Sequence, residues 1–150
     1  MVVVDTSVWI DYFKNKENSK TKLLEKILSS DKQIVLPGII YVEILQGIKT
    51  DKKFNDVKEI LDDFIFFPMG NKGTYLKAIE VYRTCRKNGI TIRKTIDCLI
   101  ASVILENDFE FLHNDKDFDS ISKFFSLKIV IMKPNNRSPD TSGTEMQYHL

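Results

Sequence analysis

The sequence has few of the features that mark membrane, secreted or zinc-binding proteins. Its 150 residues include two cysteines, Cys85 and Cys98, and two histidines, and none of these has the spacing of a zinc site or a disulfide framework. No apolar run approaches the ~20 residues that cross a membrane. Asp5 interrupts the apolar start MVVVDTS, which therefore does not resemble a secretion signal. We expect a cytoplasmic protein without a membrane segment.

The chain also lacks an excess of charge of one sign. Its 22 basic and 21 acidic side chains leave a net charge of +1, so any RNA-binding surface must be a local basic patch. No P-loop or GxGxxG pattern indicates a nucleotide cofactor. Hydrophobic residues make up 43% and charged residues 29%, which is typical of a single globular domain.

Short apolar runs alternate with amphipathic segments along residues 1–133. Strands are predicted at residues 2–4, 34–36, 64–67, 109–113 and 128–132. Helices are predicted at about residues 8–13, 20–29, 37–48, 51–63, 71–88, 95–107 and 120–125. This alternation is typical of a three-layer α/β sandwich with a mainly parallel sheet of about five strands. Residues 134–150 are rich in Asn, Ser, Thr, Pro and Gly, and we expect a flexible C-terminal tail there.

Four acidic residues stand at positions where carboxylates are unusual. Asp5 and Asp115 each follow a predicted strand, and sites in open α/β sheets form beyond the carboxyl ends of the strands. Glu43 and Asp97 lie within the apolar helical stretches IIYVEIL and TIDCLIA. A carboxylate buried in such a stretch needs a hydrogen-bond donor, a cation or a proton to offset its desolvation.

Each of the four also has a purely structural interpretation. Asp5 could cap the helix that follows it, and Asp97 could cap its own first turn. Glu43 could pair with a lysine, and Asp115 could belong to a solvated acidic loop. The combination of all four in one small domain favours a functional cluster.

A cluster of carboxylates is a natural site for a hard divalent cation. Mg²⁺ or Mn²⁺ prefers oxygen ligands and relieves the repulsion between the acidic groups. Such a cation can lower the pKa of water and neutralise charge on a phosphate under attack. Acidic residues with such a cation are therefore chemically sufficient for phosphodiester hydrolysis.

Four segments together resemble the PIN-domain nucleases, in particular the VapC-like toxins of toxin–antitoxin pairs. They are VVVDTSVWIDYF, YVEILQGI, TIDCLIAS and FLHNDKDFDSI, in the family's order and spacing, and the resemblance covers about residues 1–133. It implies a PIN-like fold and Mg²⁺- or Mn²⁺-dependent endoribonuclease activity. It also implies an RNA substrate, a cognate antitoxin and a homodimer.

The resemblance assigns site residues position by position. The acidic positions, which are both catalytic and metal-binding in the family, match Asp5, Glu43, Asp97 and Asp115. Asp117 is a further acidic neighbour in the last motif. Ser7 matches a hydroxyl that supports the acidic cluster, and Asn114 stands where a small polar residue is often found.

Basic side chains are also needed to hold RNA. Arg93 and Lys94 directly precede the third acidic motif and are the predicted phosphate contacts. Trp9 fits helix packing better than base stacking. His113 ends a buried strand, and we expect it to be structural rather than a general base.

Two other functions fit part of the pattern. A phosphatase that forms an aspartyl intermediate also places an Asp after its first strand. The haloacid-dehalogenase type requires a second Asp two residues later, where this chain has Ser7. A non-catalytic binding module that retains the PIN fold would be expected to lose acidic ligands, and none is evidently lost.

Overall fold

Six strands form one sheet in the computed structural model, which describes residues 1–133 and 145–149. The strands are β1 (Val2–Val4), β2 (Ile34–Pro37), β3 (Ile65–Phe67), β4 (Glu110–Leu112), β5 (Lys128–Lys133) and β6 (Glu145–His149). Their order across the sheet is β3-β2-β1-β4-β5-β6. The first five run parallel, and β6 pairs antiparallel with β5.

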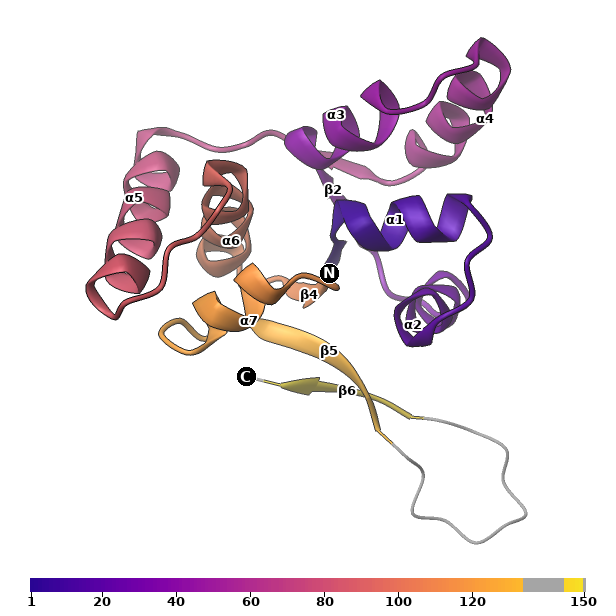
Figure 1. Ribbon diagram of the computed structural model, residues 1–150. Coiled ribbons are helices and arrows are strands. Elements are labelled where there is room, and N and C mark those ends of the chain that lie inside the picture. The colour runs from indigo at the N-terminus through magenta and orange to yellow at the C-terminus, as the bar shows by residue number, and fades with distance from the viewer. Residues whose placement is uncertain (134–144, 150) are drawn as a thin grey trace, which may run out of the picture.

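Helices cover both faces of this sheet. They are α1 (Thr6–Phe13), α2 (Ser19–Leu28), α3 (Gly38–Gln46), α4 (Asp51–Leu61), α5 (Lys72–Lys87), α6 (Thr95–Asn107) and α7 (Lys116–Ser122). Figure 1 shows α5 and α6 on one side of the sheet and α1 and α2 on the other. The predicted three-layer α/β sandwich with a mainly parallel sheet is confirmed. None of the helices within the described residues is long and apolar enough to cross a bilayer.

Strand β1 is the centre of the fold. Its three valines are fully buried, because β2 and β4 flank the strand and helices cover both faces. The chain leaves β1 toward β2 on one side and returns to β4 on the other, which makes the carboxyl end of β1 a topological switch point. Ligand sites of open α/β sheets lie in the crevice at such a point.

One predicted helix begins at a different residue, and one observed strand was not predicted. Helix α7 begins at Lys116 rather than near residue 120, because the side chain of Asp115 accepts a hydrogen bond from the Asp117 N–H and caps the helix. Strand β6 was not predicted, because its five-residue alternation EMQYH lies within a segment whose Asn, Ser, Thr, Pro and Gly content indicated a tail. The rest of the predicted tail, residues 134–144 and 150, lies outside the described residues.

Candidate active site

The carboxyl ends of β1 and β4 bring two of the predicted acidic residues to one edge of the sheet. Asp5 directly follows β1, and Asp115 follows β4 after two further residues. The Asp5 N–H donates to the Leu112 carbonyl at 2.9 Å, which joins the two strand ends. The parallel pairing of β1 with β4 therefore places Asp5 and Asp115 at the same rim.

Asp5 is a buried carboxylate that does not serve as a helix cap. Its backbone occupies the N-cap position of α1, but its side chain makes no capping hydrogen bond. The Ser7 hydroxyl donates to Oδ2 of Asp5 at 3.2 Å, the contact expected of a supporting residue. The pKa of Asp5 is raised to about 6, mainly by burial and also by the charges of Glu43 and Asp115, although hydrogen bonds from Thr6 and Ser7 lower it.

Asp97 lies in the first turn of α6 and is buried among apolar residues. Its Oδ2 atom has no hydrogen-bond partner within the described part of the chain, so a capping role does not account for it. Burial, together with the charges of Asp115 and Asp5, raises the pKa of Asp97 to about 7. Buried polar atoms are nearly always satisfied, and an orphaned carboxylate oxygen indicates a missing partner.

The start of α7 supplies Asp115 and Asp117. One side-chain oxygen from each of Asp97, Asp115 and Asp117 lies within 4.8 Å of the other two, the spacing of a group that could hold a metal ion. Asp117, a secondary candidate from the sequence, thus belongs to the closest acidic group. Only the outer part of the acidic run fits the solvated-loop interpretation, since the side chain of Asp119 is 71% exposed.

His113 fixes the backbone of this acidic segment. The Asp115 N–H donates to Nδ1 of His113 at 3.1 Å, and the ring packs against Phe111 and Phe118. Burial lowers the pKa of His113 to about 4, so the ring is neutral near pH 7. This geometry agrees with the structural role expected for His113.

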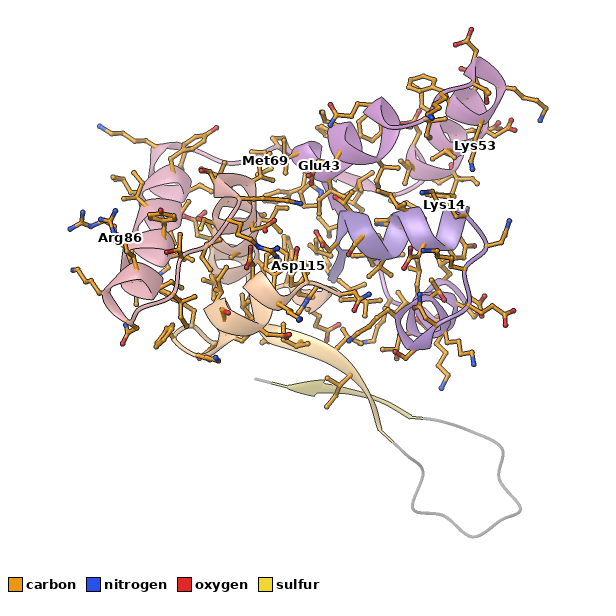
Figure 2. All side chains as sticks on the ribbon, in the orientation of Figure 1. Lys14, Glu43, Lys53, Met69, Arg86 and Asp115 are labelled. Atoms are coloured by element: carbon orange, nitrogen blue, oxygen red, sulfur yellow. The ribbon has the colours of Figure 1, made fainter. Side chains whose placement is uncertain are left out.

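Glu43 comes from α3, and its partner is a hydroxyl rather than a lysine. The Thr6 hydroxyl donates to Oε1 of Glu43 at 2.8 Å, and no ion pair to Glu43 occurs among the described residues. Figure 2 labels Glu43 on α3 and Asp115 at the start of α7, on either side of the beginning of α1. Glu43 stands outside the closest acidic group, but its charge raises the pKa of Asp5.

Thr6 is the site residue that the sequence analysis missed. Thr6 was not among the predicted site residues, although it stands between Asp5 and Ser7 in the motif DTS. Because the first residues of α1 point back over the end of β1, consecutive hydroxyls reach two different carboxylates. Thr6 reaches Glu43, and Ser7 reaches Asp5.

The predicted polar and basic neighbours differ in their contacts. Arg93 lies beside the acidic group and pairs with Asp115 and Asp117 at 3.6 and 3.4 Å. Lys94 is the N-cap residue of α6, and its charge acts to lower the pKa of Asp97. Asn114 is exposed and its side chain makes no hydrogen bond within the described residues.

Trp9 belongs to the core. It is fully buried and its ring stacks on Phe13 and lies against Phe64. Helix packing, as expected, therefore accounts for Trp9, and its ring is not available to nucleic-acid bases.

The donor set of the rim fits a hard divalent cation. The possible metal ligands at this rim are carboxylate and hydroxyl oxygens, which Mg²⁺ and Mn²⁺ prefer. Both cysteines are buried, and burial raises the pKa of each thiol. Oδ2 of Asp97 lacks a partner within the described residues, and burial and neighbouring negative charges raise the pKa values of Asp5 and Asp97. A cation bound there would relieve both.

The chain was compared with known protein families, characterised proteins and solved structures. The model of the family described as "PIN domain" matches residues 2–124. VapC ribonuclease Mb1587 of Mycobacterium bovis is 27% identical over 129 residues, which cover 85% of this chain and 96% of that protein. Ribonuclease VapC1 of Methanocaldococcus jannaschii is 26% identical over 133 residues, 85% of either chain.

Solved structures share the fold at low sequence identity. VapBC2 from Rickettsia felis, bound to a DNA fragment from its promoter, has a TM-score of 0.67 at 17% identity, over 86% of this chain and 98% of that one. A toxin–antitoxin complex from Klebsiella pneumoniae has a TM-score of 0.62 at 18% identity, over 79% of this chain and 90% of that one. At these identities the likeness establishes the fold alone.

Proposed function

This chain belongs to the PIN domain family, and from that premise we propose that it is a metal-dependent endoribonuclease, the toxin of a toxin–antitoxin pair. One observation carries the proposal. Carboxylates from four separate parts of the chain converge at the carboxyl end of β1, and one buried oxygen, Oδ2 of Asp97, has no partner within the described residues. The ribonuclease relatives supply the reaction class.

Mg²⁺ or Mn²⁺ is the proposed cofactor. Asp97, Asp115 and Asp117 are the proposed inner ligands because their oxygens lie closest together, and Asp5 adds negative charge beside them. When bound, the cation supplies Lewis acidity, which activates water and neutralises charge on the phosphate. Thr6 orients Glu43 through Oε1, and Oε2, which makes no hydrogen bond with another described residue, is the proposed group that binds the cation or accepts a proton from the attacking water.

The substrate side of the site is basic. Arg93 and Lys94 are exposed next to the acidic group and are the proposed contacts for RNA phosphates. The Ser7 hydroxyl donates to Asp5 and is the proposed support that keeps the Asp5 carboxylate oriented while RNA binds. Hydrolysis by water leaves a 5′ phosphate and needs no 2′-hydroxyl group.

RNA cleavage by the purified chain tests this function. We expect cleavage with Mg²⁺ or Mn²⁺, none in EDTA, and a loss of about 100-fold or more in Asp97→Asn. Asp63→Asn, at an exposed site far from the cluster in sequence, is the matched control and should cut normally. Sequencing the product ends identifies the RNA and reveals the terminal phosphate. A 2′,3′-cyclic phosphate, or full activity in EDTA, contradicts the mechanism.

The alternative functions give different results in the same preparation. A non-catalytic PIN-fold module would bind RNA or protein without cutting RNA under any metal condition. A metal-dependent phosphatase would release phosphate from p-nitrophenyl phosphate and leave RNA intact.

A groove between α1 and the α3–α4 segment supports an antitoxin partner. It has a volume of about 410 Å³. It combines buried or half-buried apolar residues with exposed lysines: Ile10, Phe13, Ile44 and Ile48, and Lys14, Lys49 and Lys53. Figure 2 labels Lys14 and Lys53 on the two sides of this groove. None of the three lysines makes an ion pair with another described residue, and this free positive charge favours an acidic amphipathic segment as the occupant.

Charge reversal at the groove tests the antitoxin surface. We expect the Lys14→Glu, Lys53→Glu double variant to bind the product of a small open reading frame directly upstream at least about tenfold more weakly than the wild type. Lys52→Glu, on the same α4 helix but outside the groove, should bind normally. Equal affinities for all three proteins would exclude this surface. The homodimer implied by the resemblance is a separate proposal, and sedimentation equilibrium should give twice the mass of one chain.

A further inference from the structure

Arg93 makes contacts with the acidic group that are unusual for a residue predicted to bind RNA. Its guanidinium reaches two acidic side chains of the site, with Nη2 at 3.6 Å from Oδ1 of Asp115 and Nε at 3.4 Å from Oδ2 of Asp117. Its backbone N–H also donates to Oδ2 of Asp117 at 3.3 Å. One residue in the loop before α6 therefore holds both carboxylates at the start of α7.

The two attachments of Arg93 differ in strength and in permanence. The side chain of Arg93 is 71% exposed, its contact with Asp117 is a long hydrogen bond, and its contact with Asp115 is an ion pair beyond hydrogen-bond distance, so water and salt weaken both. The backbone contact comes from the main chain of the loop and does not depend on the position of the guanidinium. The guanidinium can thus leave Asp117 without freeing the Asp117 carboxylate from the loop.

The acidic neighbours explain why the guanidinium lies there. Three carboxylates with oxygens within 4.8 Å of one another repel, and Arg93 is the basic side chain that forms ion pairs with two of these carboxylates within the described residues. A divalent cation carries twice the charge of Arg93 and can bind all three carboxylates. Cation and guanidinium therefore compete for the carboxylates of Asp115 and Asp117.

We infer that Arg93 is a displaceable counter-ion: a bound divalent cation releases its guanidinium from Asp115 and Asp117, and the released side chain then binds a phosphate of the RNA. This inference rests on the proposed metal-dependent function and extends it, since it couples metal loading to substrate binding through one positioning residue. Without the cation, the guanidinium of Arg93 stays paired with Asp115 and Asp117. The metal-free protein then makes one phosphate contact fewer with RNA.

Mn²⁺ binding without RNA tests the competition directly. Electron paramagnetic resonance of free Mn²⁺ gives the dissociation constant for the full chain and its variants. Removing a competing exposed ion pair in Arg93→Gln should tighten Mn²⁺ binding about two- to fivefold. Arg93→Lys keeps the charge and should stay within about twofold of the wild type. Arg86→Gln on α5, which removes the same charge from a side chain stacked over Tyr82, is the control for net charge.

RNA binding tests the second half of the inference. Fluorescence anisotropy of a short single-stranded RNA, with its integrity checked on a gel, gives the salt dependence of binding in EDTA and in Ca²⁺. With Ca²⁺, the salt slope of Arg93→Gln should be smaller than that of the wild type by about one phosphate contact. In EDTA the two slopes should be equal, because Arg93 is then held by its own carboxylates.

The outcomes separate this inference from the function on which it rests. Wild-type protein that binds no Mn²⁺ overturns both. If the wild type binds Mn²⁺ but Arg93→Gln binds it equally or more weakly, Arg93 is only a clamp for the acidic segment and the inference fails alone. Equal salt slopes in Ca²⁺ overturn the transfer to RNA. A thermal melt of each variant shows whether a change in affinity is accompanied by unfolding.

Discussion

Replacing Asp97 by Asn should stabilise the metal-free protein, although it abolishes the proposed activity. Burial and the charges of Asp115 and Asp5 raise the pKa of Asp97 from 3.8 to about 7. An acid whose pKa is raised by folding favours the folded state when protonated. Its contribution is therefore complete below pH 3.8 and is lost as the pH rises toward 7. Asparagine has nearly the same shape and no charge to desolvate.

The size of the effect follows from the two pKa values of Asp97. Each unit of pKa difference corresponds to about 1.4 kcal/mol. Relative to the wild type, Asp97→Asn should gain about 2 kcal/mol in the free energy of unfolding at pH 5, where the unfolded chain is already mostly ionised. The gain should reach about 4 kcal/mol at pH 8, where the folded protein is ionised as well.

Urea denaturation in EDTA at pH 5 and pH 8 measures these gains. Adding Mg²⁺ should reverse the order, because the cation stabilises the wild type and the variant has lost a ligand oxygen. Asp63→Asn should change the free energy of unfolding by less than about 0.5 kcal/mol at either pH, since Asp63 is exposed. A variant that is less stable than the wild type at pH 8, or a gain that does not grow with pH, would refute the reasoning.

Two further substitutions probe the groups that hold the carboxylates. Thr6→Val removes the hydrogen bond to Glu43 and should lower kcat/KM for RNA cleavage about tenfold. Thr6→Ser keeps the hydroxyl and should keep the activity. Equal activity of the two variants would show that this hydrogen bond does not contribute to cleavage. His113→Phe leaves the Asp115 N–H without its acceptor and should cost about 1–3 kcal/mol at pH 7 in a denaturant titration. Because burial lowers the pKa of His113 from 6.5 to about 4, the wild type should lose stability as the pH falls from 6.5 to 4. If a His113→Phe variant loses the same stability over this pH range, protonation of His113 is not the cause.

The sequence allowed much of the fold and the acidic site to be predicted, because both follow from short-range patterns. Three valines followed by Asp5 indicate a central strand with a carboxylate at its end. Glu43 and Asp97 stand out because each is an acidic residue in an otherwise apolar helical stretch. These signals depend only on the chemistry of adjacent residues, and the structure places these residues at or near the same rim.

The remaining features depend on contacts between residues far apart in the chain. The Thr6 hydroxyl meets Glu43 across 37 positions, and Arg93 meets Asp117 across 24. No local pattern distinguishes a threonine that reaches a carboxylate from one that caps a helix. Likewise, the run of acidic residues after β4 has the composition of a loop, and only the capping contact of Asp115 makes it the start of α7.

The position of the site at the switch point of the sheet has a consequence for the synthesis of the protein. Its acidic groups come from the first strand end, the third helix, the sixth helix and the start of the seventh, so they assemble only after most of the chain exists. A nascent chain that ends before β4 lacks two of the three closest carboxylates and the partner strand that anchors Asp5. Translation can therefore proceed past residue 100 before the product becomes able to degrade RNA in the cell that makes it.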